Sequence, residues 1–304
     1  MSKISDIRVV ATSFVVSIFD VALNLVIAIT TGSTVMLSQA LQGLSDLITG
    51  GILYIGVKRS KREASHRYQF GYGREVFFWV LVAGIIMFVG TGGMSLYFGY
   101  QQLRNPSLIE NVWLALGMLV FGFINNGYAF SLSVRRLIKY DTSGRWLYQL
   151  LHSSIVETKA TFLIDFLGSL SAFFGFAALG LYALTRNPMF DGLGSIVIGI
   201  GMMSVALILI NDIRSLIVGK SVDPDVAEKI IGSAESVHNI HSVLDLRTMY
   251  LGSDKLLVII EVHVHDGLET DQIEQIVDNV KEVVQVNVPQ VHHIQVEIET
   301  PDAN

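Results

Sequence analysis

The sequence predicts a membrane all-α bundle of six helices, followed by a small α+β domain. The chain has 304 residues, of which 51% are hydrophobic and 16% are charged, and its mean hydropathy is +0.52. An average soluble domain is about 25% charged. The charges are also divided by position, because residues 1–220 carry a net charge of +6 and residues 221–304 a net charge of −12. This division predicts a transmembrane domain over residues 1–219 and a cytoplasmic domain over residues 220–304.

Six apolar stretches are long enough to cross a bilayer, which takes about 20 residues as a helix. Their many small residues allow the helices to approach one another closely. The first stretch follows Lys3 and Arg8 and has no clear cleavage site, so we expect a first span and not a removed signal peptide. The six predicted spans cover residues 7–30, 35–57, 76–100, 111–134, 157–184 and 193–218.

Positive charges on the links between the spans predict the orientation of the bundle. The links 58–75 and 135–145 contain six and four Lys or Arg residues, whereas the opposite face has only Arg104 and Arg186. Links rich in Lys and Arg remain in the cytoplasm. We therefore expect a multi-pass protein of the cell (inner) membrane, with both termini in the cytoplasm.

After Lys220 the pattern changes to that of a small soluble domain. Asp223-Pro224-Asp225 is a good helix start, and Gly252-Ser253-Asp254 separates two segments of alternating apolar residues, which indicates a hairpin. The order α-β-β-α-β predicts a two-layer α+β fold. The predicted elements are a helix over 225–236, strands over 242–251 and 255–265, a helix over 269–286 and a strand over 291–299.

The composition excludes several classes of function. The chain has no Cys, which rules out disulfides, iron–sulfur clusters, thiolate metal sites and Cys nucleophiles. The acidic C-terminal part would repel phosphates, so we expect no nucleic-acid partner.

Acidic residues inside membrane helices are costly and, by default, mark ion or proton pathways. Asp46 follows Gln42 by four residues on the second span, and Asp165 follows Thr161 by four residues on the fifth. Each pair therefore shares a helix face, and two such helices present four oxygen ligands for a cation. The alternative is that Asp46 and Asp165 are packing carboxylates held by Ser or Asn, and the spacing alone favours neither reading.

Three more polar residues are candidates for accessory roles. Glu157 lies one turn before Thr161 and lines the predicted entry path. Asp20 and Asn24 lie one turn apart on the first span, where they line the cavity or form hydrogen bonds between helices. Lys159 is expected to reach the membrane surface or to pair with Glu157.

Three motifs carry a resemblance to a known family. Thr31-Gly32-Ser33, with Ala40-Leu41-Gln42-Gly43-Leu44-Ser45-Asp46, is similar to the TGS…AxHSxxD stretch of the cation diffusion facilitator family. His66-Arg67-Tyr68-Gln69-Phe70-Gly71-Tyr72-Gly73-Arg74-Glu75 resembles its H-x-Y-x-FGxGRxE loop, and Asp245-Leu246-Arg247-Thr248 resembles its DLRT strand. The motifs occur in the family's order over nearly the whole chain.

The resemblance implies a transporter and not an enzyme, with no organic cofactor. It implies export of a divalent transition metal from the cytoplasm by alternating access, usually in exchange for protons. It also implies a homodimer formed through a metallochaperone-like, ferredoxin-like cytoplasmic domain.

By position, the family's four metal ligands on the second and fifth spans fall on Gln42, Asp46, Thr161 and Asp165. Both leading positions depart from the usual His or Asp, as in a branch of the family with altered ligands. Oxygen ligands suit harder ions than zinc, so zinc, manganese and iron all stay open as substrates. A scaffold or metal sensor that retains the fold without transport is the alternative from another class, and an intramembrane hydrolase with two aspartates is a distant third.

The C-terminal part contains six of the eight His residues. His263 and His265 alternate along a strand and share a face, and Glu297 approaches from a neighbouring strand. These three residues are a candidate for a regulatory metal site. The alternative, which we favour, is that the His side chains are simply solvated.

Overall fold

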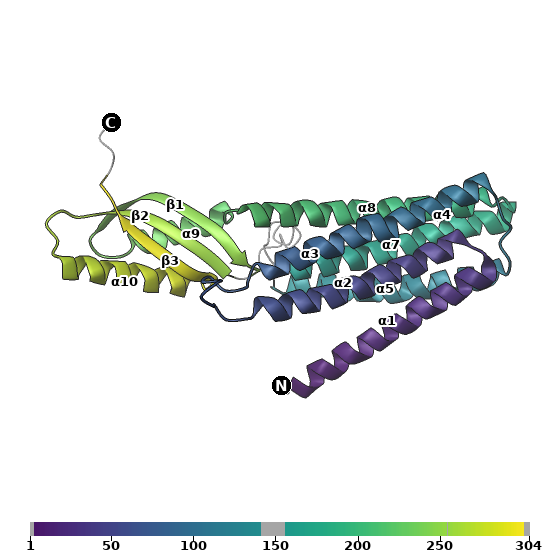
Figure 1. Ribbon diagram of the computed structural model, residues 1–304, viewed down its shortest axis with the longest axis horizontal. Helices are drawn as coiled ribbons and strands as arrows, with labels where there is room; N and C mark the ends of the chain where they lie inside the picture. The colour runs from purple at the N-terminus through teal and green to yellow at the C-terminus, as the bar shows by residue number, and fades with distance from the viewer. Residues whose placement is uncertain (1–2, 141–155, 254, 301–304) are drawn as a thin grey trace. The chain divides into compact units, whose positions relative to one another are not determined.

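The computed structural model describes residues 3–140, 156–253 and 255–300 (Figure 1). The chain forms two compact units. The first contains the residues up to Gly56 together with Phe78–Ile213, and the second contains Val57–Phe77 together with the residues from Arg214 onward. Each unit is described separately below.

The first unit is built from long apolar helices, which confirms the predicted multi-pass membrane bundle. Within the described residues, five helical segments are long and apolar enough to cross a membrane, and Ser17–Thr31 of the first helix is a shorter apolar stretch. The third span is divided by a π-helix. The helices are α1 (Lys3–Thr31), α2 (Thr34–Ser60), α3 (Glu75–Ile85), η1 (Ile86–Gly92), α4 (Gly93–Arg104), α5 (Val112–Tyr140), α7 (Val156–Thr185) and α8 (Met189–Val218). Residues 141–155 of the basic link predicted between the fourth and fifth spans lie outside the described residues.

Glycines let α4 and α8 touch backbone to backbone. A Cβ atom on Gly99 would lie 2.7 Å from the carbonyl oxygen of Gly192, and one on Gly192 would lie 2.8 Å from that of Gly99. No side chain fits at such distances. Because lipid provides no hydrophobic driving force between helices, close packing at small residues of this kind stabilises the contact instead.

A buried carboxylate joins α2 to α8 at one end of the bundle. Asp191 is fully buried in the first turn of α8. Its Oδ1 accepts hydrogen bonds from Ser33 Oγ at 2.6 Å and from the Val35 amide at 3.0 Å. Its Oδ2 accepts from the amide and from the hydroxyl of Thr34, both at 2.8 Å. Asp191 thus caps the N-terminus of α2, where a negative charge is favourable.

The second unit contains the predicted α-β-β-α-β domain, and the prediction of its elements is confirmed. Strands β1 and β2 are antiparallel, β3 pairs with β2 in parallel, and the sheet order is β1-β2-β3. On the central strand, Leu256, Val258, Ile260 and Val262 are all fully buried, so the alternate residues face away from this core. The elements are α9 (Pro224–Glu235), β1 (Ile240–Gly252), β2 (Lys255–Val264), α10 (Thr270–Asn287) and β3 (Val291–Ile298).

The link between α2 and α3 packs against this sheet. A Cβ atom on Gly73 would lie 2.2 Å from the Leu251 carbonyl oxygen, so the backbones touch there. The ring of Phe70 meets that of His293 edge-on, with centroids 5.3 Å apart. The compact units therefore differ from the predicted cut at residue 219, because residues 57–77 belong with the C-terminal part.

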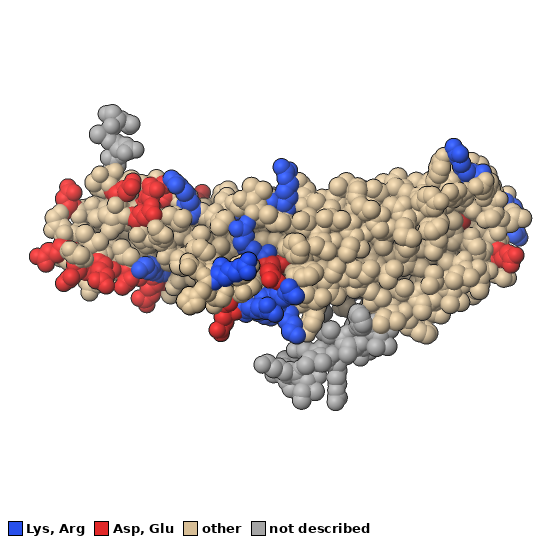
Figure 2. Space-filling view, in the orientation of Figure 1, with Lys and Arg blue, Asp and Glu red and all other residues tan. Residues whose placement is uncertain are grey.

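Charged side chains are distributed unevenly between the two units. Figure 2 shows few charged side chains over the described long helices, whereas acidic side chains gather over the sheet and helices of the C-terminal part. This distribution agrees with the division of net charge along the sequence.

Candidate functional site

Three helices of the membrane bundle bring carboxylates into the same region. Asp46 of α2 interacts electrostatically with Asp165 of α7 and also with Asp20 of α1. The described residues bring no three His, Asp or Glu side chains close enough together to hold one metal ion. The structure therefore places three carboxylates near one another without drawing them into a closed ligand shell.

Asp165 is held by the neighbouring helix α5. It accepts a short hydrogen bond from the hydroxyl of Ser133. Beside it, the ring of Phe130 contacts those of Phe162 and Phe166, with centroids 5.4 and 5.6 Å apart. The sequence did not point to Ser133, because a single Ser in an apolar helix has no pattern that reveals its partner.

Gln42 is hydrogen-bonded to a residue of α7 beyond Asp165. It is 3% exposed, and its Oε1 accepts a hydrogen bond from Ser171 of α7. Ser171 lies six residues beyond Asp165, which is about 9 Å along a helix. The amide of Gln42 is therefore engaged further along the bundle than a ligand shared with Asp165 would be.

The other predicted residues of α7 lie on the opposite side of Asp165 along the helix. Thr161, one turn before Asp165, is exposed. Glu157 lies in the helix, but its side chain is outside what the structure describes. Of the four predicted ligands, Asp46 and Asp165 come together, while Gln42 and Thr161 lie along the helices on either side of them.

Asp20 has an incomplete set of hydrogen-bond partners. Asn24 is buried, and its Nδ2 donates to Asp20 Oδ2 at 3.2 Å and to the Asp20 carbonyl oxygen at 2.9 Å. The other carboxylate oxygen, Oδ1, is buried without a partner among the described residues. The hydroxyl of Ser45, beside Asp46, is likewise buried and unpartnered there. Buried polar atoms in this state are rare and call for an explanation such as an ion.

A buried ion pair joins α7 to α8 nearby. Lys159 is 2% exposed, and its Nζ lies 2.6 Å from Oδ2 of Asp212. The expectation that Lys159 reaches the membrane surface was wrong, because α8 supplies a carboxylate beside it. A buried lysine without such a partner would be very costly.

On the C-terminal sheet, His263 and His265 have a different neighbour from the one predicted. His241 of β1 lies between them, with ring centroids 5.4 Å from His263 and 5.7 Å from His265. Glu297 lies opposite Glu261 and accepts a hydrogen bond from Gln295 at 2.8 Å. The predicted group of His263, His265 and Glu297 is therefore not assembled, because Glu297 pairs further back along β2. Metal binding by this part of the chain stays a prediction.

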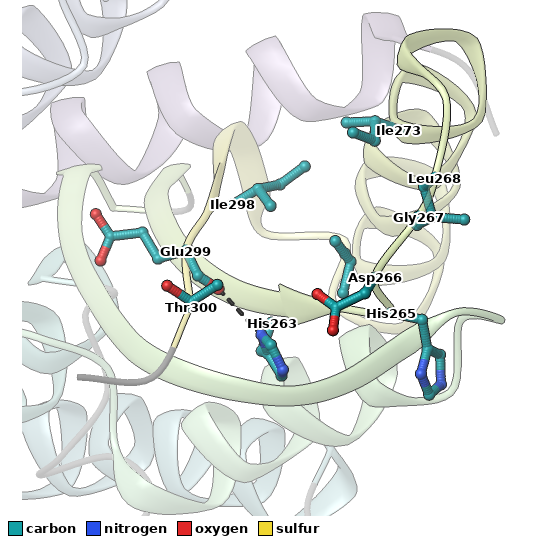
Figure 3. A pocket seen from close by; sticks show the side chains of 10 residues that line it. His263, His265, Asp266, Gly267, Leu268, Ile273, Ile298, Glu299 and Thr300 are labelled. Carbon is teal, nitrogen blue, oxygen red and sulfur yellow. Dashed lines mark hydrogen bonds between the residues drawn. The ribbon is translucent and has the colours of Figure 1, made fainter. Parts of the chain in front are cut away.

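A shallow pocket of about 550 Å³ lies beside these His residues. Figure 3 shows the rings of His263 and His265 standing apart, with the carboxylate of Asp266 on the His263 side. His263 Nδ1 lies 3.3 Å from the carbonyl oxygen of Glu299.

Glu261, further along the same sheet face, lies among other acids. Its side chain is 19% exposed, with Arg247 at 3.7 Å. Desolvation, together with the carboxylates of Glu299, Asp245 and Glu297, raises the pKa of Glu261 above its ordinary value against the opposing effect of Arg247.

Comparison with known proteins places this bundle in a family. Residues 10–218 match the family model described as the cation efflux transmembrane domain. The chain belongs to the cation efflux family. The match covers Asp20, Asp46 and Asp165, so the three carboxylates lie in the part of the chain that defines the family.

Several curated relatives of this cation efflux protein are known. It is 26% identical over 264 residues to the proton-coupled zinc antiporter SLC30A9, mitochondrial, of Homo sapiens. The alignment covers 83% of this chain and 46% of the relative. It is 23% identical over 291 residues to the magnetosome protein MamB of Magnetospira sp. (strain QH-2), which covers 95% of this chain and 93% of that protein. The chain thus spans somewhat less than half the length of the SLC30A9 relatives.

Among solved structures, the chain is similar to a MamM CTD variant in its nickel form. The identity is 21%, and the match covers 26% of this chain and 100% of that one, with a TM-score of 0.25.

Proposed function

We propose that this cation efflux protein carries a divalent transition metal ion out of the cytoplasm in exchange for protons. One observation carries the proposal: Asp46 and Asp165, from two different helices, interact within an apolar membrane bundle. Two carboxylates in such surroundings repel each other, and a divalent cation between them removes both the repulsion and the cost of burial.

The same pair of carboxylates couples metal movement to protons. Protons and the metal ion compete for the same carboxylate oxygens, so binding of one favours release of the other. The hydrogen bond from Ser133 orients Asp165. A positioned ligand of this kind retains its geometry when the ion leaves.

The two ends of the bundle support alternating access. At one end, Asp191 joins α2 to α8, and the Tyr182 hydroxyl donates to the Ile109 carbonyl at 3.1 Å and accepts from its amide at 2.8 Å. On the other side of Asp165, Thr161 is exposed. We infer that the site is reached from the Thr161 end. The Lys and Arg residues of the 58–75 link lie at that end of α2, which supports a cytoplasmic assignment for this side of the bundle. We propose that both termini also lie in the cytoplasm and that the protein is located in the cell (inner) membrane.

We further propose that the C-terminal part mediates homodimerisation, as the family resemblance implies. A second candidate function, a scaffold or sensor without transport, is favoured by Gln42, whose Oε1 accepts a hydrogen bond from Ser171.

The decisive experiment is metal uptake by the purified full-length protein in liposomes that contain a metal-sensitive dye. Zinc, manganese, iron(II) and cobalt are each offered under an imposed proton gradient. We expect uptake of at least one ion, and a loss of at least about 100-fold in Asp46→Ala and Asp165→Ala. Ser131→Ala is the matched control, because Ser131 lies on α5 and donates only to a carbonyl of its own helix. Absence of uptake for every ion would support the scaffold or sensor, and uptake that survives both Asp substitutions would exclude this site.

A further inference from the structure

Asp20 lies next to a close contact between α1 and α2. A Cβ atom on Gly43 would lie 2.8 Å from Cγ2 of Val21, so only a glycine permits this approach without displacing that side chain. Asp20 precedes Val21, and Asp46 lies three residues beyond Gly43. The electrostatic interaction of Asp20 with Asp46 follows from this close packing.

The hydrogen bonds at this contact leave acceptors available. Asp20 Oδ2 is satisfied by Asn24, whereas Oδ1 is buried and unpartnered among the described residues. Ser45, next to Asp46, is 1% exposed and has an unpartnered hydroxyl in the same part of the described chain. The described residues also donate no hydrogen bond to Asp46. Apart from the amide nitrogen of Gln39, the buried side-chain atoms without a partner among the described residues are therefore oxygens, one on α1 and one on α2.

Imidazole and thiolate ligands are missing from the described membrane helices. The chain has no Cys, and none of its eight His residues falls within α1, α2, α3, η1, α4, α5, α7 or α8 as described. The amide of Gln42 is engaged by Ser171. Carboxylate, hydroxyl and water oxygens in sixfold arrangements are typical of manganese(II), whereas zinc prefers four ligands that include imidazole or thiolate.

We infer that Asp20 is a third carboxylate ligand for the transported ion, and that it directs the site toward manganese(II) in preference to zinc. This inference rests on the proposed function. The three carboxylates repel one another without a cation, which accounts for their not converging to ligand distance in the structure. A manganese ion draws Asp20 toward Asp46 and Asp165 and supplies the missing partner for its Oδ1.

The test compares manganese and zinc on the full-length protein, by equilibrium binding in detergent and by liposome uptake. In Asp20→Asn, we expect manganese affinity and uptake to fall by at least about tenfold, since loss of even an outer ligand partner costs this much. Zinc affinity should change by less than about threefold, because zinc is satisfied with four ligands. Asp20→Glu retains the carboxylate and should recover most of the manganese affinity. If Asp20→Asn fails to fold, Asp20→Ser replaces it as the variant without the carboxylate.

Thr30→Val is the matched control on α1, because Thr30 is exposed and its hydroxyl donates only to carbonyls of its own helix. This variant should bind both ions as the unmodified protein does. Unchanged manganese binding in Asp20→Asn, with loss of binding in Asp46→Ala, would overturn the inference and leave the proposed function standing. An equal loss of both ions would overturn the preference for manganese. Failure of the unmodified protein to move any divalent ion would instead overturn the proposed function itself.

Discussion

Two groups of acids in the same membrane bundle have opposite surroundings. Asp191 receives four hydrogen bonds, two on each carboxylate oxygen, from the turn between α1 and α2. Asp20 has a buried oxygen without any partner among the described residues, and its neighbours at Asp46 and Asp165 are acids as well. The difference indicates that the supply of donors, and not the residue type, separates a carboxylate that holds helices together from one that we propose binds an ion.

Removing one acid from each group tests whether the two groups affect stability and uptake differently. Asp191→Ala leaves buried amide and hydroxyl donors without partners, so we expect a loss of about 3 kcal/mol in the free energy of unfolding. Asp46→Asn removes repulsion between acids, so it should leave stability unchanged or slightly raised while uptake is lost. Thermal unfolding in detergent and liposome uptake measure the two effects. A stable Asp191→Ala protein would contradict the structural role of Asp191.

The Lys159–Asp212 pair tests whether another acid of the bundle belongs to the structural group. Lys159→Met keeps the length of the side chain but leaves the carboxylate of Asp212, which is 20% exposed, without its cation. We expect a loss of about 2 kcal/mol in stability, less than for a fully buried pair. The double variant Lys159→Met with Asp212→Leu should recover most of it. If the double variant is no more stable than the single one, the pair is not what holds α7 to α8.

Ser133 tests how Asp165 is positioned within the proposed ion-binding group of Asp20, Asp46 and Asp165. Ser133→Ala removes the hydrogen bond to Asp165 without touching a carboxylate. We expect about a tenfold weaker apparent affinity for the transported ion, with a maximal uptake rate close to that of the unmodified protein. Uptake measured over a range of ion concentrations separates the two quantities, with Ser131→Ala as the control. An unchanged affinity would show that Ser133 does not orient Asp165.

The smallest expected effect concerns an acid outside the membrane. Because the pKa of Glu261 is raised in the folded protein, its ionisation opposes folding, and stability is lost as the pH rises from about 4.5 through the raised pKa. Glu261→Gln should therefore protect the β2 amides from hydrogen exchange more than the unmodified protein at pH 7. Below about pH 4.5 the two should be equal, because Glu261 is then protonated in both the folded and unfolded states. Equal protection at both pH values would contradict the crowding of acids on this sheet face.

Much of the fold could be predicted from the sequence, because it depends on local patterns. The apolar stretches, the Lys and Arg residues of the 58–75 link and the hairpin signal at Gly252 are all features of consecutive residues. They predicted the spans and the α-β-β-α-β order within a few residues. The π-helix in the third span was missed, because its Ile86–Gly92 segment is as apolar as an ordinary α-helix there.

The sequence also indicated the acids of the proposed site, because acids within apolar helices are conspicuous whichever way they face. On that ground it singled out Asp20, Asp46, Glu157 and Asp165, and the four-residue spacing and the family motifs added Gln42 and Thr161. Only the tertiary structure decided which distant residues pair with the polar residues of the spans: Ser133 with Asp165, Ser171 with Gln42 and Asp212 with Lys159. Helical periodicity determines the face on which a side chain lies but not which helix packs against that face. The packing of α1, α2, α5, α7 and α8 therefore decides which acids are saturated with donors and which keep oxygens available for an ion.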